Sequence, residues 1–314
     1  MKSSATLAVV GALAMLVSAT TLHAQSNRES RQGLHFPVYR VAQRPAAPAR
    51  PNANVPSRTL PVRPVAAQAE HPLKPMISKA EELLAKMDKD VEDYSATLVK
   101  RERINGVLHD YQYMQTKVRH EQKNARGEVT APFSVYLNFL APEDIKGREV
   151  IYVEGHNGGK LTAHEGGSGL IAAIKSAVTV NLDPTSDRAM KGNKYPITDI
   201  GVQNLLNKLI EVATEDLKYD EVEVKVFENT KINGRVCTCL QSVHPQPRDH
   251  FRFHIARIYI DDELQIPIRY ESYGWPKGDG DPPLLEEYTY LNLKLNNGFT
   301  DRDFDKSNPN YNFN

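Results

Sequence analysis

The chain has 314 residues, of which 40% are hydrophobic and 25% charged, and its 39 basic and 39 acidic side chains give a formal net charge of zero. This balance argues against a nucleic-acid-binding protein, because such proteins normally present a strongly basic surface. Two cysteines alone are too few for a zinc site.

The first 24 residues have the pattern of an export signal. Lys2 is followed by an almost wholly apolar run from Ala5 to Val17, which is too short to span a bilayer comfortably. Small polar residues follow, and Ala24 precedes an acceptable cleavage site. We therefore predict that residues 1–24 are a removed signal peptide and that the protein is periplasmic or secreted. The alternative is an uncleaved N-terminal anchor.

Residues 25–73 differ in composition from the rest of the chain. They contain eight prolines, and seven arginines against two glutamates, without apolar periodicity. Proline removes a backbone donor and disfavours helix at the residue before it, so we predict a disordered, extended arm. The arm is either a solubilising spacer or a basic contact for an anionic surface or an envelope protein.

From residue 74 to residue 314 we predict one folded domain, which opens with an amphipathic helix whose apolar residues follow helical spacing from Ile77 to Met87. Ser78 with Glu81 or Glu82 offers N-terminal capping for this helix. The apolar period then changes to two residues, and Asn105-Gly106 predicts a hairpin turn. Strands are predicted at 94–104, 109–120, 132–140, 148–155 and 159–165.

A mixed insert at 168–195 separates these strands from a second helix, which Asp199 is predicted to cap. Five further strands are predicted at 221–228, 235–243, 251–260, 265–273 and 285–295. Asn233-Gly234 marks another hairpin. The polar tail that follows carries three aromatic side chains that could fix it to the domain, Phe304, Tyr311 and Phe313.

The order of helix, strands, helix and strands predicts an α+β fold with an antiparallel sheet. Within 251–260 the apolar positions change parity, from Phe251 and Phe253 to Ile258 and Ile260, which is typical of a strongly curved sheet. We predict an incomplete half-barrel of about 10–11 strands, with two or three helices on its concave side.

Three adjacent acids, Asp261, Asp262 and Glu263, could form a catalytic or metal-binding cluster. They lie between two alternating segments with only about four residues separating them, and aspartate favours tight turns. We therefore predict a hairpin tip. Pro267 lacks a backbone donor, so its strand is at an edge of the sheet or has that position directed outward.

The histidines and glycine-rich stretches show no catalytic pattern. His250 and His254 would lie about 13 Å apart on a strand, too far for one metal ion. "GGSGL" at 166–170 lacks the spacing of a nucleophile elbow, and "GHNGGK" at 155–160 lacks that of a phosphate-binding loop. We predict no enzyme activity, no catalytic residue, no metal and no cofactor.

The two cysteines, Cys237 and Cys239, lie two residues apart in a predicted strand, so both side chains face the same side of the sheet. Their Cα atoms would then be at the limit of the range for a disulfide. We predict two buried thiols, with a disulfide or a redox pair as the alternative.

The order of these segments over about residues 76–306 resembles the LolA/LolB and RseB (MucB) superfamily of periplasmic lipoprotein-binding half-barrels. It is most similar to a bacterial family of unknown function with a LolA-like domain. Two stretches carry most of the resemblance, the hairpin "IYIDDELQIPIR" from Ile258 to Arg269 and the ending "FTDRDFD" from Phe299 to Asp305. The proline- and arginine-rich arm and the insert at 168–195 are additions to a minimal carrier.

The resemblance implies a hydrophobic cavity for acyl chains and brings no catalytic residues with it. The function it implies is non-enzymatic binding of a lipid or an acylated lipoprotein. The alternative is a cell-envelope interaction or sensor module without a carrier role. The strand faces give nine candidates for the cavity wall: Phe133, Val135, Leu137, Phe139, Ile151, Phe251, Phe253, Leu291 and Leu293.

Overall fold

The computed structural model describes residues 70–166 and 178–313. The predicted signal peptide, nearly all of the predicted arm and the first part of the insert at 168–195 lie outside the described residues. The predictions for those segments therefore stay predictions.

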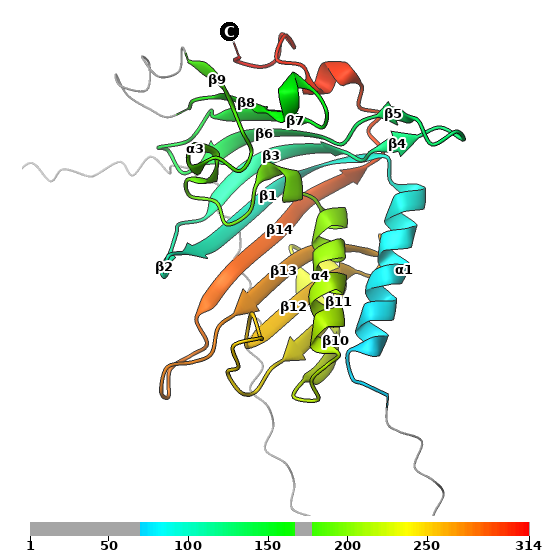
Figure 1. Cartoon of the computed structure of the whole chain (residues 1–314), viewed down its shortest axis with the longest axis vertical. Helices are drawn as coiled ribbons and strands as arrows, with labels where there is room; N and C mark the ends of the chain where they lie inside the picture. Colours follow the sequence, from blue (N-terminus) through cyan, green and yellow to red (C-terminus); the bar gives the residue numbers. More distant parts are fainter. Residues whose placement is uncertain (1–69, 167–177, 314) are drawn as a thin grey trace, which may run out of the picture. The chain divides into compact units, whose positions relative to one another are not determined.

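An open, curved antiparallel sheet dominates the described part of the chain, and with the helices it confirms the predicted α+β class (Figure 1). Its twelve strands include the two-residue β2, which pairs only with β1. The spatial order of the others is β10-β11-β12-β13-β14-β1-β3-β6-β7-β8-β9. The last strand in sequence, β14, therefore pairs with the first, β1, in the middle of the sheet. The strands are β1 (Asp93–Ile104), β2 (Val107–Leu108), β3 (Gln112–Arg119), β6 (Ser134–Ala141), β7 (Glu149–Val153), β8 (Leu161–His164), β9 (Thr179–Leu182), β10 (Glu223–Ile232), β11 (Arg235–Val243), β12 (Ile255–Asp261), β13 (Ile266–Tyr273) and β14 (Leu284–Leu295).

A separate two-stranded ribbon, β4 (Gln122–Lys123) with β5 (Val129–Ala131), extends from the sheet. The predicted Asn-Gly hairpins are confirmed. Asn105 has φ 50° and Gly106 has φ 82°, and Asn233 and Gly234 have 49° and 82°. Positive φ at both central residues suits a two-residue hairpin loop, which explains the choice of Asn followed by Gly.

Two helices, α1 (Lys74–Asp90) and α4 (Val202–Asp216), lie side by side on one face of the sheet (Figure 1). Each turns an apolar stripe inward, because positions three and four residues apart share a helix face. A short helix, α3 (Asp187–Met190), and the 3₁₀ turns η1 (Asn157–Gly159), η2 (Ile197–Asp199) and η3 (Asp301–Phe304) complete the fold. None of the helices among the described residues is long and apolar enough to cross a membrane.

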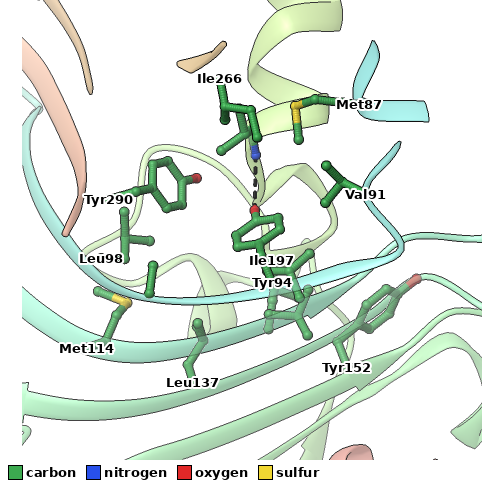
Figure 2. Packing of buried hydrophobic residues seen from close by; sticks show 14 of the residues in the cluster. Met87, Val91, Tyr94, Leu98, Met114, Leu137, Tyr152, Ile197, Ile266 and Tyr290 are labelled. Atoms are coloured by element: carbon green, nitrogen blue, oxygen red, sulfur yellow. Dashed lines mark hydrogen bonds between the residues drawn. The ribbon is translucent and has the colours of Figure 1, made fainter. Parts of the chain in front are cut away.

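Both predicted helix caps are wrong. Helix α1 begins four residues before Ser78, with Pro75 in its first turn, where the fixed φ of proline is already helical. Asp199 ends the turn η2, and α4 begins after Gly201, whose φ is 119°. The first free N–H of α4, that of Val202, instead donates to the hydroxyl of Tyr94 over 3.1 Å (Figure 2).

The main apolar core lies between the helices and the sheet. Met87 lies on α1, and Val91 directly follows this helix. Both belong to the same apolar cluster as Leu98 of β1 and Met114 of β3, and Figure 2 shows these side chains. A second cluster lies on the opposite face of β6 and β7, where the C-terminal tail covers Tyr136 and Ile151. All three predicted tail aromatics are buried there, Phe304, Tyr311 and Phe313.

Two strand predictions need correction. Residues 251–254 lie outside β12, which begins at Ile255. Pro267 lies in β13, an interior strand, so of the two predicted alternatives the edge strand is wrong. The β12–β13 register is interrupted between Tyr259 and Ile260, opposite Pro267, and such an irregularity accommodates a residue that cannot donate.

Candidate ligand cavity

A cavity of about 1270 Å³ lies on the face of the sheet that carries the helices. Its walls come from β1, β3, β6, β7, β8, β9, β13 and β14, and from α3, α4 and the segment that joins these two helices. Because side chains alternate along a strand, each strand contributes every second residue to this wall.

One part of the wall is apolar and continuous with the main core. Its residues come from neighbouring strands and belong to the same apolar cluster. They include Leu98, Met114, Leu137, Phe139, Val150, Leu161, Ala163 and Tyr290.

The other part of the wall is polar. On β1 the strand period that brings Leu98 into the cavity also brings in Lys100 and Glu102. On β14 the period of Tyr290 brings in Tyr288 and Glu286 in the same way. These residues form the "polar end", together with Gln112, Asn193, Lys194, Tyr195, Tyr270 and Ser272.

Both carboxylates of the polar end are paired. Lys100 Nζ lies 3.0 Å from a Glu102 oxygen, and Lys194 Nζ lies 2.8 Å from a Glu286 oxygen. The backbone N–H of Lys194 donates to Glu102 over 3.1 Å, so the segment between α3 and α4 is tied to β1. The two carboxylates are buried, which requires such pairing to offset their lost hydration.

Two tyrosine hydroxyls of the polar end stay protonated over any ordinary pH range. Burial raises the pKa of Tyr288 well above its usual value, and the nearby Glu286 and Glu102 carboxylates raise it further. Tyr195 is 38% exposed as a residue, but desolvation of its hydroxyl raises its pKa as well, with Glu286 as the next largest cause. The Tyr288 hydroxyl is therefore a lasting hydrogen-bond donor, and it donates to Glu102 over 2.5 Å.

Three of the nine residues predicted from the strand faces lie on the cavity wall: Leu137, Phe139 and Phe253. Two more belong to the main core without lining the cavity, Val135 within the cluster and Phe133 packed against it. The structure therefore brings five of the nine to the cavity face or next to it.

The other four lie elsewhere. Ile151 is on the opposite face of β7, beneath the C-terminal tail. Phe251 stacks on His244 with ring centroids 3.9 Å apart. Leu291 is buried but belongs to none of the apolar clusters of the described residues, and Leu293 packs between two of them.

The polar end was not predicted from the sequence. One signal for it is the spacing of Lys100 and Glu102, which continue the strand period of Leu98 inward and so replace apolar residues at core positions. Tyr288 and Glu286 give the same signal on β14. Charged residues at inward positions of a strand occur both in binding sites and at solvated strand ends.

The acidic triplet has the predicted structural role. Asp261 ends β12, and Asp262 and Glu263 are in the turn to β13. The Asp261 carboxylate accepts the N–H of Glu263 and of Leu264 at 3.0 and 2.9 Å, and it pairs with Arg235. These contacts fix the hairpin and lie outside the cavity wall.

The remaining candidates also have structural partners. His250 stacks on Tyr219 with ring centroids 3.7 Å apart, and His254 lies against Trp275. Within residues 70–166 and 178–313, no group of three or more His, Cys, Asp or Glu side chains could hold a metal ion.

Both cysteines are free and buried, as predicted for two thiols on one face of β11. Burial raises the pKa of the Cys237 thiol to about 11 and that of Cys239 to about 12. A thiol reacts as its thiolate, so neither is activated for redox chemistry.

Residues 91–313 match the model of a family described as "Protein of unknown function (DUF1571)". A comparison with curated proteins finds no match.

The solved structures that are similar include members of the LolA superfamily. The lipoprotein LppX of Mycobacterium tuberculosis is 14% identical, with 74% of this chain and 100% of that chain covered and a TM-score of 0.38. A LolA superfamily protein of Nitrosomonas europaea is 9% identical, with 72% and 97% covered and a TM-score of 0.29. MucB, in a complex with MucA, is 16% identical, with 73% and 59% covered and a TM-score of 0.37. Likeness at this level carries no conclusion about function.

Proposed function

The chain belongs to the DUF1571 family, whose function is unknown, and we propose that it is an exported protein that binds a lipid or an acylated lipoprotein in its cavity. The proposal includes no catalysed reaction. One observation carries it: a cavity of about 1270 Å³ whose inner wall is continuous with the apolar core. Ligand pockets commonly measure roughly 300–1,000 Å³, so this cavity is large enough for a long apolar chain.

Apolar burial supplies the binding energy in this proposal. Each buried methylene contributes about 0.8 kcal/mol, which corresponds to roughly a fourfold gain in affinity. Of the nine residues predicted from the sequence, we propose that Leu137, Phe139 and Phe253 contact the ligand, because these three line the cavity.

The test is a titration of the purified protein with saturated fatty acids of increasing length, combined with native mass spectrometry for lipid that co-purifies. We expect one ligand per chain and an affinity that rises roughly fourfold with each methylene until the apolar part is filled. An affinity independent of chain length, with no co-purified lipid, contradicts the proposal.

A variant that fills the cavity separates this site from adventitious surface binding. Ala163 is a small residue on the wall, and Ala163→Phe places a ring in the space proposed for the ligand. The matched control is Val129→Phe, because Val129 is 50% exposed in the ribbon of β4 and β5, which contributes no residue to the cavity wall. We expect weaker acyl binding in the first variant only, at an unchanged melting temperature for the control.

Export and the role of the arm form the second part of the proposal. The pattern of residues 1–24 predicts that the mature protein begins at Gln25, which N-terminal sequencing of the exported protein tests. Deletion of 25–69 keeps Leu73, which is buried in a cluster with Ile77 and Val222. This deletion should leave acyl binding intact and remove any contact with an anionic surface or an envelope partner.

A further inference from the structure

The polar end of the cavity has balanced charge and incompletely used hydrogen-bonding groups. Resting on the proposed function, we infer that it selects amphiphiles whose head group is uncharged and rich in hydroxyls, such as a sugar or glycerol. The inference concerns the head group and is independent of which acyl chain is bound.

The charges of the polar end cancel within the site. Lys100 with Glu102 and Lys194 with Glu286 form two pairs, at 3.0 and 2.8 Å, and the two glutamates lie directly opposite each other on β1 and β14. An anionic group that approached Lys194 would also approach Glu286, and a cationic group that approached Glu286 would meet Lys194. Either charge would lose its hydration without gaining a net opposite charge, which is unfavourable in a buried site.

The hydrogen-bonding groups of the polar end that are not fully used include both donors and an acceptor. Among the described residues Lys194 Nζ has one ion-pair partner, Glu286, and lies 5.3 Å from the centre of the Tyr195 ring, although an ammonium carries three donors. Gln112 lies opposite Lys100 on β3, and its Oε1 is a buried acceptor without a partner in the described part of the chain. A hydroxyl donates and accepts at once, so a hydroxyl-rich group can serve both residues without displacing either ion pair.

Aromatic rings border the polar end. Tyr270 and Tyr288 are stacked with centroids 6.5 Å apart and planes at 14°, and Tyr195 lies in the same wall. Each ring offers an apolar face next to a polar hydroxyl. Such a mixed surface suits a sugar or glycerol, whose carbon atoms are apolar and whose substituents are hydroxyls.

The test compares four amphiphiles with the same twelve-carbon chain below their micelle concentrations, in competition with a fluorescent fatty acid. They are dodecyl maltoside, dodecyltrimethylammonium, dodecylphosphocholine and lauroyl lysophosphatidylglycerol. We expect dodecyl maltoside to bind about tenfold more tightly than each charged or zwitterionic amphiphile, a difference of about 1.4 kcal/mol.

Two charge variants sharpen the test. Glu286→Gln leaves Lys194 uncompensated, so the preference should move toward the anionic amphiphile. Lys194→Met leaves Glu286 uncompensated, so the preference should move toward the cationic one. Thermal melting checks that each variant is folded. If a variant is not folded, the comparison of the four amphiphiles on the wild-type protein still tests the inference.

The outcomes separate the inference from the proposed function. Equal affinity for the four amphiphiles, or tighter binding of a charged or zwitterionic one by the wild-type protein, overturns the inference and leaves acyl binding in place. If none of the four binds and no fatty acid binds either, the proposed function itself fails.

Discussion

Glu102 of β1 lies directly opposite Glu286 of β14, with both side chains on the cavity wall. Like charges in directly opposed positions destabilise a sheet unless other groups compensate them. The Tyr288 hydroxyl does so from between them, at 2.5 Å from Glu102 Oε1 and 3.4 Å from Glu286 Oε2. Lys100 and Lys194 each form an ion pair with one of the two carboxylates.

We expect Tyr288→Phe to destabilise the protein by about 1–3 kcal/mol, because it leaves a buried carboxylate oxygen without its donor. Urea unfolding measures this change. A double-mutant cycle with Glu102→Gln should give a coupling energy of roughly 0.5–3 kcal/mol, as for residues in direct contact.

The matched control is Tyr111→Phe. The Tyr111 hydroxyl also faces a glutamate of β14, Glu287, but over 3.4 Å and at a half-buried position on the other side of the strand. We expect a smaller loss of stability in this variant. An equal loss in both variants would show that the short Tyr288 contact contributes no more to stability than the longer Tyr111 contact.

The N-terminus of α4 depends on Tyr94. This fully buried hydroxyl, from β1, accepts the N–H of Val202 over 3.1 Å, in place of the side-chain cap that the helix lacks (Figure 2). Tyr94→Phe should therefore cost about 1–3 kcal/mol, because a buried N–H is left unpaired. Hydrogen exchange at Val202 should accelerate more than exchange in the middle of the sheet.

Tyr152→Phe is the control for this prediction. Tyr152 belongs to the same apolar cluster, and in Figure 2 its ring lies apart from the dashed bond at the Tyr94 hydroxyl. We expect exchange at Val202 to be unchanged in the control. Unchanged exchange at Val202 in Tyr94→Phe as well would remove the role of Tyr94 as a helix cap.

Local sequence patterns predicted the strands and hairpins well, because alternation along a strand and the residues of a tight turn each involve only a few neighbouring residues. Alternation in β6 put Leu137 and Phe139 on one strand face, and both line the cavity, while the Asn-Gly pairs correctly marked two turns. The same alternation could not assign Ile151, because β7 is apolar on both faces. Its second face is covered by a tail more than a hundred residues later, which no local pattern reveals.

Other features depend on contacts that are distant in sequence. The apolar residues Phe251 and Phe253 suggested a strand, but a turn bond from the N–H of Phe251 to the carbonyl of Arg248 bends the chain there. The polar end needs β1, β14 and the segment before α4 to meet. Only the pairing of the first strand with the last brings these segments together.

His120 should make stability depend on pH near neutrality. Burial lowers the pKa of this histidine below its usual 6.5, although a bond to the Val91 carbonyl at 2.8 Å and the charges of Asp88 and Asp93 act in the opposite direction. The unfolded chain therefore binds a proton at a higher pH than the folded one. Stability is complete above about pH 6.5 and falls as the pH decreases from there toward the folded pKa.

The measurement is the melting temperature between pH 8 and pH 5 for the wild type, His120→Asn and the exposed control His156→Gln. The wild type and the control should lose stability across this range, and His120→Asn should lose less. Identical pH dependence in all three proteins would assign the effect to other groups.

Asp261 should stabilise the β12–β13 hairpin through two separable contacts. Burial acts to raise the pKa of this carboxyl, but the bonds from Arg235 and from the N–H groups of Leu264 and Glu263 outweigh it, so the pKa lies below the usual 3.8. The stability from this group is therefore present above about pH 3.8 and is lost as the pH falls through the folded pKa.

Asp261→Asn keeps an oxygen that can accept the two turn N–H groups but removes the charge that pairs with Arg235. Asp261→Ala removes both, so we expect a loss of about 1–3 kcal/mol beyond that of Asp261→Asn. Urea unfolding at pH 7 gives the two losses, and the adjacent exposed Asp262→Ala is the control. Equal losses for the asparagine and alanine variants would mean that the ion pair, and not the turn, accounts for this residue.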